Sequence, residues 1–177
     1  MASPIDLKLQ VFKSEARKSA LRAFDAAQSA YGGCGLRPLQ ISVEPISVDA
    51  VRMAANWGEC GSMYPWADAL RWKSRDRRGF DISIWAGTEL CGLCYATPRA
   101  SAICMKIVLL EGQPDQNHPL KGRIMALALA AVDAYARMMG CSTIQIQEPA
   151  PGAVPCYLKS GFYYDQAGRL VLLLDEA

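Results

Sequence analysis

Residues 109–162 read LLEGQPDQNHPLKGRIMALALAAVDAYARMMGCSTIQIQEPAPGAVPCYLKSGF. An apolar strand end is followed by a loop rich in Pro, Asp and Asn. A long Ala-, Met- and Leu-rich stretch then predicts a helix from about Pro119 to Met139, and Gly140 is a residue type that ends helices. Alternation over 142–147 predicts a short strand, and a Pro-rich turn leads to Tyr-Leu-Lys-Ser-Gly-Phe at 157–162. This stretch therefore predicts a strand, a loop, a long helix, a strand and a turn in succession.

The rest of the chain carries further strand and helix signals. Further strands are expected at 39–44, 80–85, 90–96, 102–110, 162–164 and 170–174. Further helices are expected from Ser47 or Asp49 toward Trp57, from Pro65 to Arg75, and over 152–160. The order is strand, two helices, three strands, helix, strand, helix, two strands, which is typical of an α+β fold. No repeat or linker is visible, so we expect one domain over residues 1–177.

Residues 1–38 precede this order as an N-terminal extension. Ile5, Leu7, Leu9 and Val11 alternate with other residues and predict a short strand. Ser14 is a suitable cap for a following helix that runs to about Tyr31, where the Gly-rich stretch 32–35 ends it. Whether this strand-and-helix arm packs on the domain is left open by its sequence.

Composition excludes several classes of protein. The chain of 177 residues has 19 basic and 17 acidic residues and a net charge of +2, which gives no large footprint for nucleic acid or an anionic membrane. No apolar run approaches a membrane span, and the first residues lack the pattern of a signal peptide, so the expected location is the cytoplasm.

The seven cysteines are expected to be reduced thiols, several of them in the core. Cys91 and Cys94 have the spacing of half a zinc site, but they lie in a predicted strand, where residues three apart face opposite sides. There is no second Cys pair of this spacing, and His118 is the only histidine, so no structural metal site is expected.

The order of elements and the string Tyr157-x-x-x-Gly161-Phe162 resemble the GCN5-related N-acetyltransferase (GNAT) superfamily. The resemblance covers most of residues 39–175. It implies a mixed, mostly antiparallel sheet flanked by helices. It also implies acetyl transfer from acetyl-CoA, with acetyl-CoA as co-substrate and no metal.

The same resemblance implies the residues that bind acetyl-CoA. The pyrophosphate motif of the superfamily, Arg/Gln-x-x-Gly-x-Gly/Ala, aligns with residues 121–126, which implies binding by Lys121, Gly122, Arg123, Ile124 and Ala126. Ile124 departs from the pattern, because the motif has Gly there. Without a ligand, the same residues are a helix start with Asn117 or His118 as cap and Pro119 at the first position.

The strand before this loop is implied to splay away from its neighbour and to offer backbone groups to the pantetheine arm. Those groups would come from Val108, Leu109 and Leu110.

Three further residues are candidates for proton transfer. Tyr157 aligns with a general acid that protonates the departing thiolate, and the alternative is a packing role. Glu111 is the leading candidate for the general base and Glu148 the second, although either is also an ordinary solvated carboxylate. His118 lies on the phosphate side, where a capping or solvated role is expected.

Two other segments bear on the acceptor. The loop Trp57–Trp66 holds three aromatic residues among glycines and either lines an acceptor pocket or fills the core. The run Arg71, Lys73, Arg75, Arg77 and Arg78 is expected to be a solvated helix face, with an acidic or RNA partner as the sharper alternative.

The resemblance thus implies an N-acetyltransferase that acts on a primary amine. The sequence does not identify the acceptor, and it is compatible with a homodimer. The first alternative is a GNAT-like protein that acts through protein contacts, because the phosphate motif is altered and the N-terminal arm is extra. The second alternative is acetylation of an amine carried by RNA, which only the basic run motivates.

Overall fold

The sheet is mixed and mostly antiparallel, as the sequence predicts. A computed structural model describes residues 4–30, 40–98, 101 and 103–174 of the chain. Within these residues the seven strands lie in the order β1-β2-β3-β4-β5-β7-β6, and β4 with β5 is the parallel pair. The strands are β1 Ile41–Glu44, β2 Phe80–Ala86, β3 Glu89–Thr97, β4 Cys104–Gly112, β5 Thr143–Ile146, β6 Tyr163–Tyr164 and β7 Leu170–Leu173.

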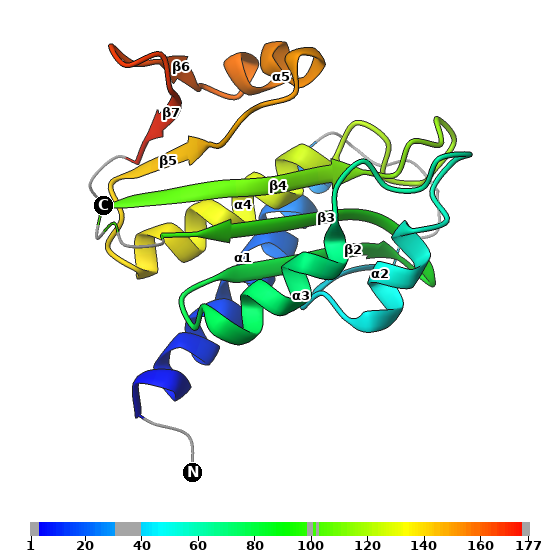
Figure 1. The fold of residues 1–177 in the computed structure, drawn as a ribbon, viewed down its shortest axis with the longest axis horizontal. Helices are drawn as coiled ribbons and strands as arrows, with labels where there is room; N and C mark the ends of the chain where they lie inside the picture. Colours follow the sequence, from blue (N-terminus) through cyan, green and yellow to red (C-terminus); the bar gives the residue numbers. More distant parts are fainter. Residues whose placement is uncertain (1–3, 31–39, 99–100, 102, 175–177) are drawn as a thin grey trace.

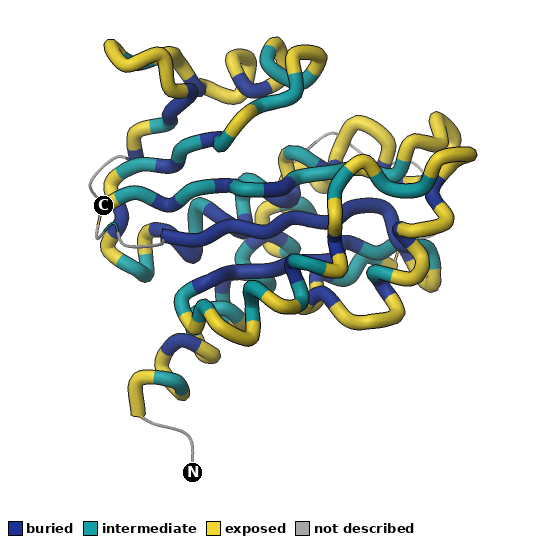
Figure 2. Tube along the Cα trace, viewed as in Figure 1, coloured by how far each residue is buried: buried dark blue, intermediate teal, exposed yellow. Residues whose placement is uncertain are grey.

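Helices cover both faces of this sheet, as Figure 1 shows. The helices are α1 Pro4–Ala30, α2 Val48–Ala54, α3 Trp66–Arg75, α4 Ile124–Met138 and α5 Val154–Lys159, the last preceded by a 3₁₀ turn at Pro151–Ala153. Helices α2 and α3 lie on one face, and α1 and α4 lie on the other. Each face has its own apolar cluster, and the central strands between them are buried along their length (Figure 2).

The described part of the N-terminal extension is one long helix, Pro4–Ala30, so the predicted strand at Ile5–Val11 is wrong. Leu9, Phe12, Ala16 and Ala20 recur at helical spacing. Leu9 is buried, and Phe12, Ala16 and Ala20 belong to the apolar cluster on the α4 side, whereas Ile5, Leu7 and Val11 are exposed. The alternation that resembled a strand comes from the end of α1 that extends beyond the sheet. The Gly-rich stretch 32–35 lies outside the described residues.

A buried carboxylate joins the extension to both layers. Asp81, which is 4% exposed, accepts hydrogen bonds from the Lys73 ammonium on α3 at 2.7 Å and from the Ile46 N–H at 2.7 Å. Arg17 on α1 donates to the Asp81 carbonyl at 2.9 Å. Residues far apart in the sequence therefore converge on one residue, Asp81, near the start of β2.

The predicted basic run is not one solvated face. Lys73 pairs with buried Asp81, Arg71 with Asp68 at 3.0 Å and Arg77 with Asp6 at 3.2 Å. Three of the five cations are therefore paired with carboxylates of the same chain.

The prediction that Cys91 and Cys94 face opposite sides of the sheet is wrong. Ile84 pairs with Gly92 and Trp85 pairs with Leu90, so Cys91 is an extra residue in β3 and forms a bulge. Both thiols consequently lie in the cluster on the α4 side. Within the described residues, no group of His, Cys, Asp or Glu is arranged to hold a metal ion, and no helix is long and apolar enough to span a membrane.

Candidate active site

Strand β4 has an unpaired edge in its second half. Its parallel pairing with β5 ends at Ile107, which faces Ile146, and the last bond between them joins the Gln147 N–H to the Ile107 carbonyl at 2.9 Å. β4 continues to Gly112, and among the described residues this part of it pairs only with β3. In Figure 1, β5 diverges from β4, and the chain that follows β5 leads to α5. Val108–Leu110, the residues expected to meet the pantetheine arm, form this free edge.

A cleft, here called the splay groove, opens along this edge. It lies between β4 and the segment that runs from the end of β5 into α5. Its lining residues are Tyr64, Ile107, Val108, Leu110, Ile146, Gln147, Glu148, Pro149, Ala150, Ala153 and Tyr157. The groove thus brings together Tyr157, Glu148 and the unpaired strand edge.

A β-bulge at Val108 sets the direction of the residues that follow it. Tyr95 pairs with Leu109 and Ala96 with Ile107, so Val108 is the extra residue of β4. Ile107 packs in the cluster on the α4 side, whereas Val108 and Leu109 both belong to the cluster under α2 and α3. In a regular strand Glu111 would share the face of Ile107. The bulge turns Glu111 to the α3 face instead.

The start of α4 offers free backbone donors beside the groove. The first bond of the helix runs from the Leu127 N–H to the Arg123 carbonyl at 3.1 Å. Within the described residues, the N–H groups of Ile124, Met125 and Ala126 therefore have no recorded acceptor. Free N–H groups and the positive end of the helix dipole form an anion site when basic side chains are near.

Ile124 does not obstruct this terminus, although a glycine is usual in the motif. Its side chain is 7% exposed and points down onto the sheet. A Cβ added at Gly92 would lie 2.5 Å from Ile124 Cγ2, and one at Gly112 would lie 3.5 Å from Ile124 Cγ1. Two strand glycines therefore make the space that the isoleucine side chain fills.

The predicted helix start is wrong by several residues. The helix begins at Ile124 with Arg123 as N-cap, not at Pro119. Gly122 has φ of 77°, and turns at 118–123 join Lys121 to His118 and Arg123 to Leu120. Neither Asn117 nor His118 caps the helix.

The cations of the motif are exposed, and one of them touches the extension. Lys121 and Arg123 are both exposed beside the helix start. The Arg123 guanidinium lies 5.6 Å from the centre of the Phe24 ring on α1. The far end of the N-terminal helix therefore reaches the candidate phosphate site.

His118 is buried, so the solvated role is wrong. It is 5% exposed, and its Nδ1 has no partner among the described residues. Burial, with Lys121 as the next contributor, lowers the pKa of this imidazole. His118 is therefore neutral near pH 7.

Tyr157 lies in the wall of the splay groove at 4% exposure, and its ring packs edge-on against Phe162 at 5.6 Å. No hydrogen-bond partner of its hydroxyl is recorded within the described residues. Burial raises the pKa of the phenol well above its ordinary value, so the group holds its proton. The residue both packs and presents a protonated hydroxyl to the groove.

The Glu111 carboxylate is occupied by the loop before α3. It accepts from the Met63 N–H at 2.6 Å, the Tyr64 N–H at 3.4 Å and the Trp66 indole N–H at 2.7 Å. A general base needs a lone pair that faces the substrate. The contacts of Glu111 instead hold the loop against the end of β4.

In loop 57–66, two of the three aromatic residues fill the core and the third lines the splay groove. Trp57 and Trp66 are 4% and 2% exposed and belong to the core under α2 and α3, so they do not line an acceptor pocket. Tyr64 lines the splay groove, and Met63 is 72% exposed. The loop therefore contributes one aromatic side chain to the candidate site.

Glu148, the second base candidate, is exposed on the groove wall just after β5. Its φ of 48° is left-handed, a conformation that non-glycine residues adopt rarely and often at functional sites. No hydrogen bond or ion pair of its carboxylate is recorded within the described residues.

Sequence reasoning missed a second cavity, here called the Trp72 pocket. It is lined by Trp72, Arg75, Asp76, Tyr95, Thr97 and Val108 and has a volume of about 290 Å³. Trp72 and Asp76 are four residues apart along α3 and its C-cap, and Tyr95 and Thr97 are two apart on β3. These spacings place each pair on one face and were the available signal.

Solved structures identify the fold. Ard1 from Thermoplasma volcanium superposes with a TM-score of 0.57 at 15% identity, over 77% of this chain and 99% of that chain. The GNAT domain of PAT from S. lividans gives 0.57 at 17% identity, over 76% and 90%. A putative acetyltransferase, yncA from Salmonella typhimurium, solved with its cofactor acetyl-CoA, gives 0.55 at 13% identity, over 77% and 95%.

The chain therefore has the GNAT fold that residues 109–162 predicted. No protein-family model matches the sequence, and no curated protein is significantly similar to it.

Proposed function

We propose that this protein is an acetyl-CoA-dependent N-acetyltransferase that acts on a primary amine. The observation that carries the proposal is the unpaired edge Val108–Leu110, which lies in one groove with Tyr157 and leads to the free N–H groups of α4. The GNAT-fold protein yncA, whose structure contains acetyl-CoA, supports the choice of co-substrate.

The backbone of this chain would hold the co-substrate. Val108, Leu109 and Leu110 would pair with the pantetheine amides, as an added strand does. The N–H groups of Ile124, Met125 and Ala126 would receive the pyrophosphate, with Lys121, Gly122 and Arg123 beside them in the motif. A backbone N–H near the Val108 bulge would polarise the thioester carbonyl.

Transfer then requires balanced proton movements. The acceptor ammonium first loses a proton to solvent, and its nitrogen then attacks the thioester carbon, so that a C–N bond forms and the C–S bond breaks. Tyr157 gives its proton to the departing sulfur and later regains one from solvent. The nitrogen loses a second proton through water to Glu148. The net products are an amide, CoA thiol and one proton.

Glu111 has a positioning role in this proposal. It holds Tyr64 at the groove through its bonds to the loop, and it does not take the proton of the amine.

A panel of amines with acetyl-CoA tests the proposal, with thiol release and intact mass of the product as readouts. A product heavier by one acetyl group is expected for at least one amine. Absence of any product, together with absence of CoA binding, would favour a protein that acts through contacts. The exposed apolar residues Ile5, Leu7 and Val11 on α1 motivate that second candidate.

A further inference from the structure

The Trp72 pocket lies next to the proposed reaction centre. Val108, the bulged residue of β4, lines both this pocket and the splay groove. The pocket lies on the α3 side of the sheet, and the groove opens along the strand edge. A molecule that fills the pocket can therefore extend past Val108 toward the thioester.

The walls of the pocket favour a cation. The rings of Trp72 and Tyr95 pack against each other with their centres 5.6 Å apart and a tilt of 55°, and both residues line the pocket. Aromatic faces attract ammonium groups through the quadrupole of the ring. Its volume of about 290 Å³ suits a small ligand and not a macromolecule.

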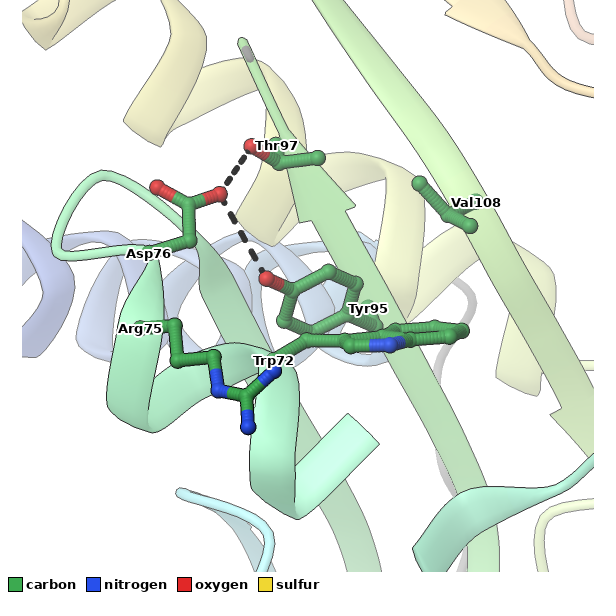
Figure 3. Close-up of a pocket in the computed structure, with 6 residues that line it drawn as sticks. All are labelled: Trp72, Arg75, Asp76, Tyr95, Thr97 and Val108. Atoms are coloured by element: carbon green, nitrogen blue, oxygen red, sulfur yellow. Dashed lines mark hydrogen bonds between the residues drawn. The ribbon is translucent and has the colours of Figure 1, made fainter. Parts of the chain in front are cut away.

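A carboxylate closes one end of the pocket. Asp76 accepts hydrogen bonds from the Thr97 hydroxyl and, at 3.5 Å, from the Tyr95 hydroxyl (Figure 3). Both hydroxyl groups donate to the carboxylate, so this end of the pocket carries a negative charge and, among the residues that the structure describes, no cationic side chain of its own. Within the described residues, Asp76 forms no ion pair with Lys or Arg, and its Oδ1 accepts a further hydrogen bond from the Arg78 N–H at 3.0 Å. All three donors are neutral groups, so the carboxylate keeps its net negative charge.

Arg75 is the opposing charge in this pocket. Its side chain is exposed, and in Figure 3 its guanidinium extends away from Asp76, on the other side of Trp72. Solvent screens a charge in that position. A cation in the pocket is therefore most stable at the end formed by Asp76, Tyr95 and Thr97, away from the positive charge of Arg75.

We infer that the acceptor carries two amino groups, and that the pocket binds the one that is not acetylated. The distal ammonium lies among Trp72, Tyr95 and Asp76, while the chain between the amines passes Val108 and brings the other nitrogen to the groove. The inference rests on the proposed function and adds the class of acceptor, a short α,ω-diamine or a molecule that contains one.

The test compares pairs of amines that differ only in the second amino group, cadaverine against pentylamine and putrescine against butylamine. For the wild-type protein, kcat/KM should be about 10- to 100-fold higher for the diamine, the range for a hydrogen bond to a charged group. Asp76→Asn should remove most of this preference through the KM of the diamine. Asp68→Asn, on the exposed face of α3, is the matched control and should keep the preference.

Binding without turnover gives an independent measurement. Calorimetry of cadaverine with CoA-saturated protein should give binding that pentylamine lacks and that Asp76→Asn abolishes. If Asp76→Asn does not fold, Trp72→Leu serves as the second variant, because it removes an aromatic face and leaves the carboxylate.

Equal kcat/KM for both amines of a pair, or absence of cadaverine binding to CoA-saturated protein, would overturn the inference alone. Failure to bind CoA at all would instead overturn the proposed function.

Discussion

The Glu111 carboxylate and the Trp66 indole are joined by a hydrogen bond of 2.7 Å, which fastens the first residue of α3 to the end of β4. The bond exists because the Val108 bulge turns Glu111 to the α3 face. The same carboxylate accepts from the Met63 N–H at 2.6 Å, so one side chain fixes the loop that places Tyr64 in the groove.

Glu111→Gln tests this positioning role. The glutamine amide presents only one oxygen to three donors, so the free energy of unfolding should fall by about 1–3 kcal/mol. The KM of the acceptor should rise, while the Kd of acetyl-CoA stays unchanged. Urea unfolding, kinetics and calorimetry measure these quantities, and Glu44→Gln, at the exposed last residue of β1, is the control. Loss of kcat with unchanged stability and KM would show that Glu111 is a general base.

Tyr157→Phe should lower kcat by about 100-fold or more while leaving the fold and the Kd of acetyl-CoA unchanged, because it removes only the proton donor. Burial raises the pKa of Tyr157, so the wild-type phenol stays protonated up to at least about pH 10 and kcat should not decline below that pH. Exposed Tyr163→Phe is the control. An unchanged kcat in Tyr157→Phe would show that Tyr157 packs in the core and is not the general acid.

His118 should make stability depend on pH. Burial lowers the pKa of the folded imidazole below 6.5, so between that pKa and 6.5 the unfolded chain binds more protons than the folded one. The free energy of unfolding should therefore decrease as the pH falls through about 6.5. Because His118 is the only histidine, His118→Gln should remove this component from urea unfolding measured between about pH 8 and pH 5. Parallel curves for the two proteins would contradict the burial of a neutral imidazole.

Gly92 and Ile124 should be energetically coupled. Gly92→Ala places a methyl group 2.5 Å from Ile124 Cγ2 and should cost about 1–3 kcal/mol of stability by overpacking. In an Ile124→Ala background the same change should cost at least about 1 kcal/mol less, because the clashing methyl group is absent. Unfolding by denaturant of the four proteins closes the cycle, and additive costs would show that Ile124 does not occupy the space above Gly92.

The order of strands and helices from β1 onward could be predicted because its signals are local. Ser47 caps α2 with a bond of 3.1 Å to the Ala50 N–H, and Gly140 and Gly161 have positive φ at the ends that the sequence predicted. The start of α4 was misplaced because Pro119 is as compatible with a tight turn as with a first helical turn.

The β-bulges at Cys91 and Val108 could not be predicted, although they determine which side chains face the candidate site. Nothing in the composition of β3 or β4 marks Cys91 or Val108 as the extra residue, since a bulge depends on the pairing of two strands. With strictly alternating side chains, Cys91 and Cys94 are predicted on opposite faces of the sheet. The same rule places Glu111 on the face away from Trp66, so their contact could not be predicted. The role of Ile124 likewise depends on Gly92 and Gly112, which are distant in the sequence.

Calorimetry of acetyl-CoA with the wild-type protein tests the central claim most directly. We expect saturable binding at one site. Lys121→Ala with Arg123→Ala should weaken this binding by about 1–3 kcal/mol, because charge-assisted hydrogen bonds to the pyrophosphate are lost. The double variant Arg52→Ala with Arg71→Ala, which removes two exposed cations on α2 and α3, should bind like the wild type. Absence of heat and of any thermal shift at millimolar acetyl-CoA would contradict the account.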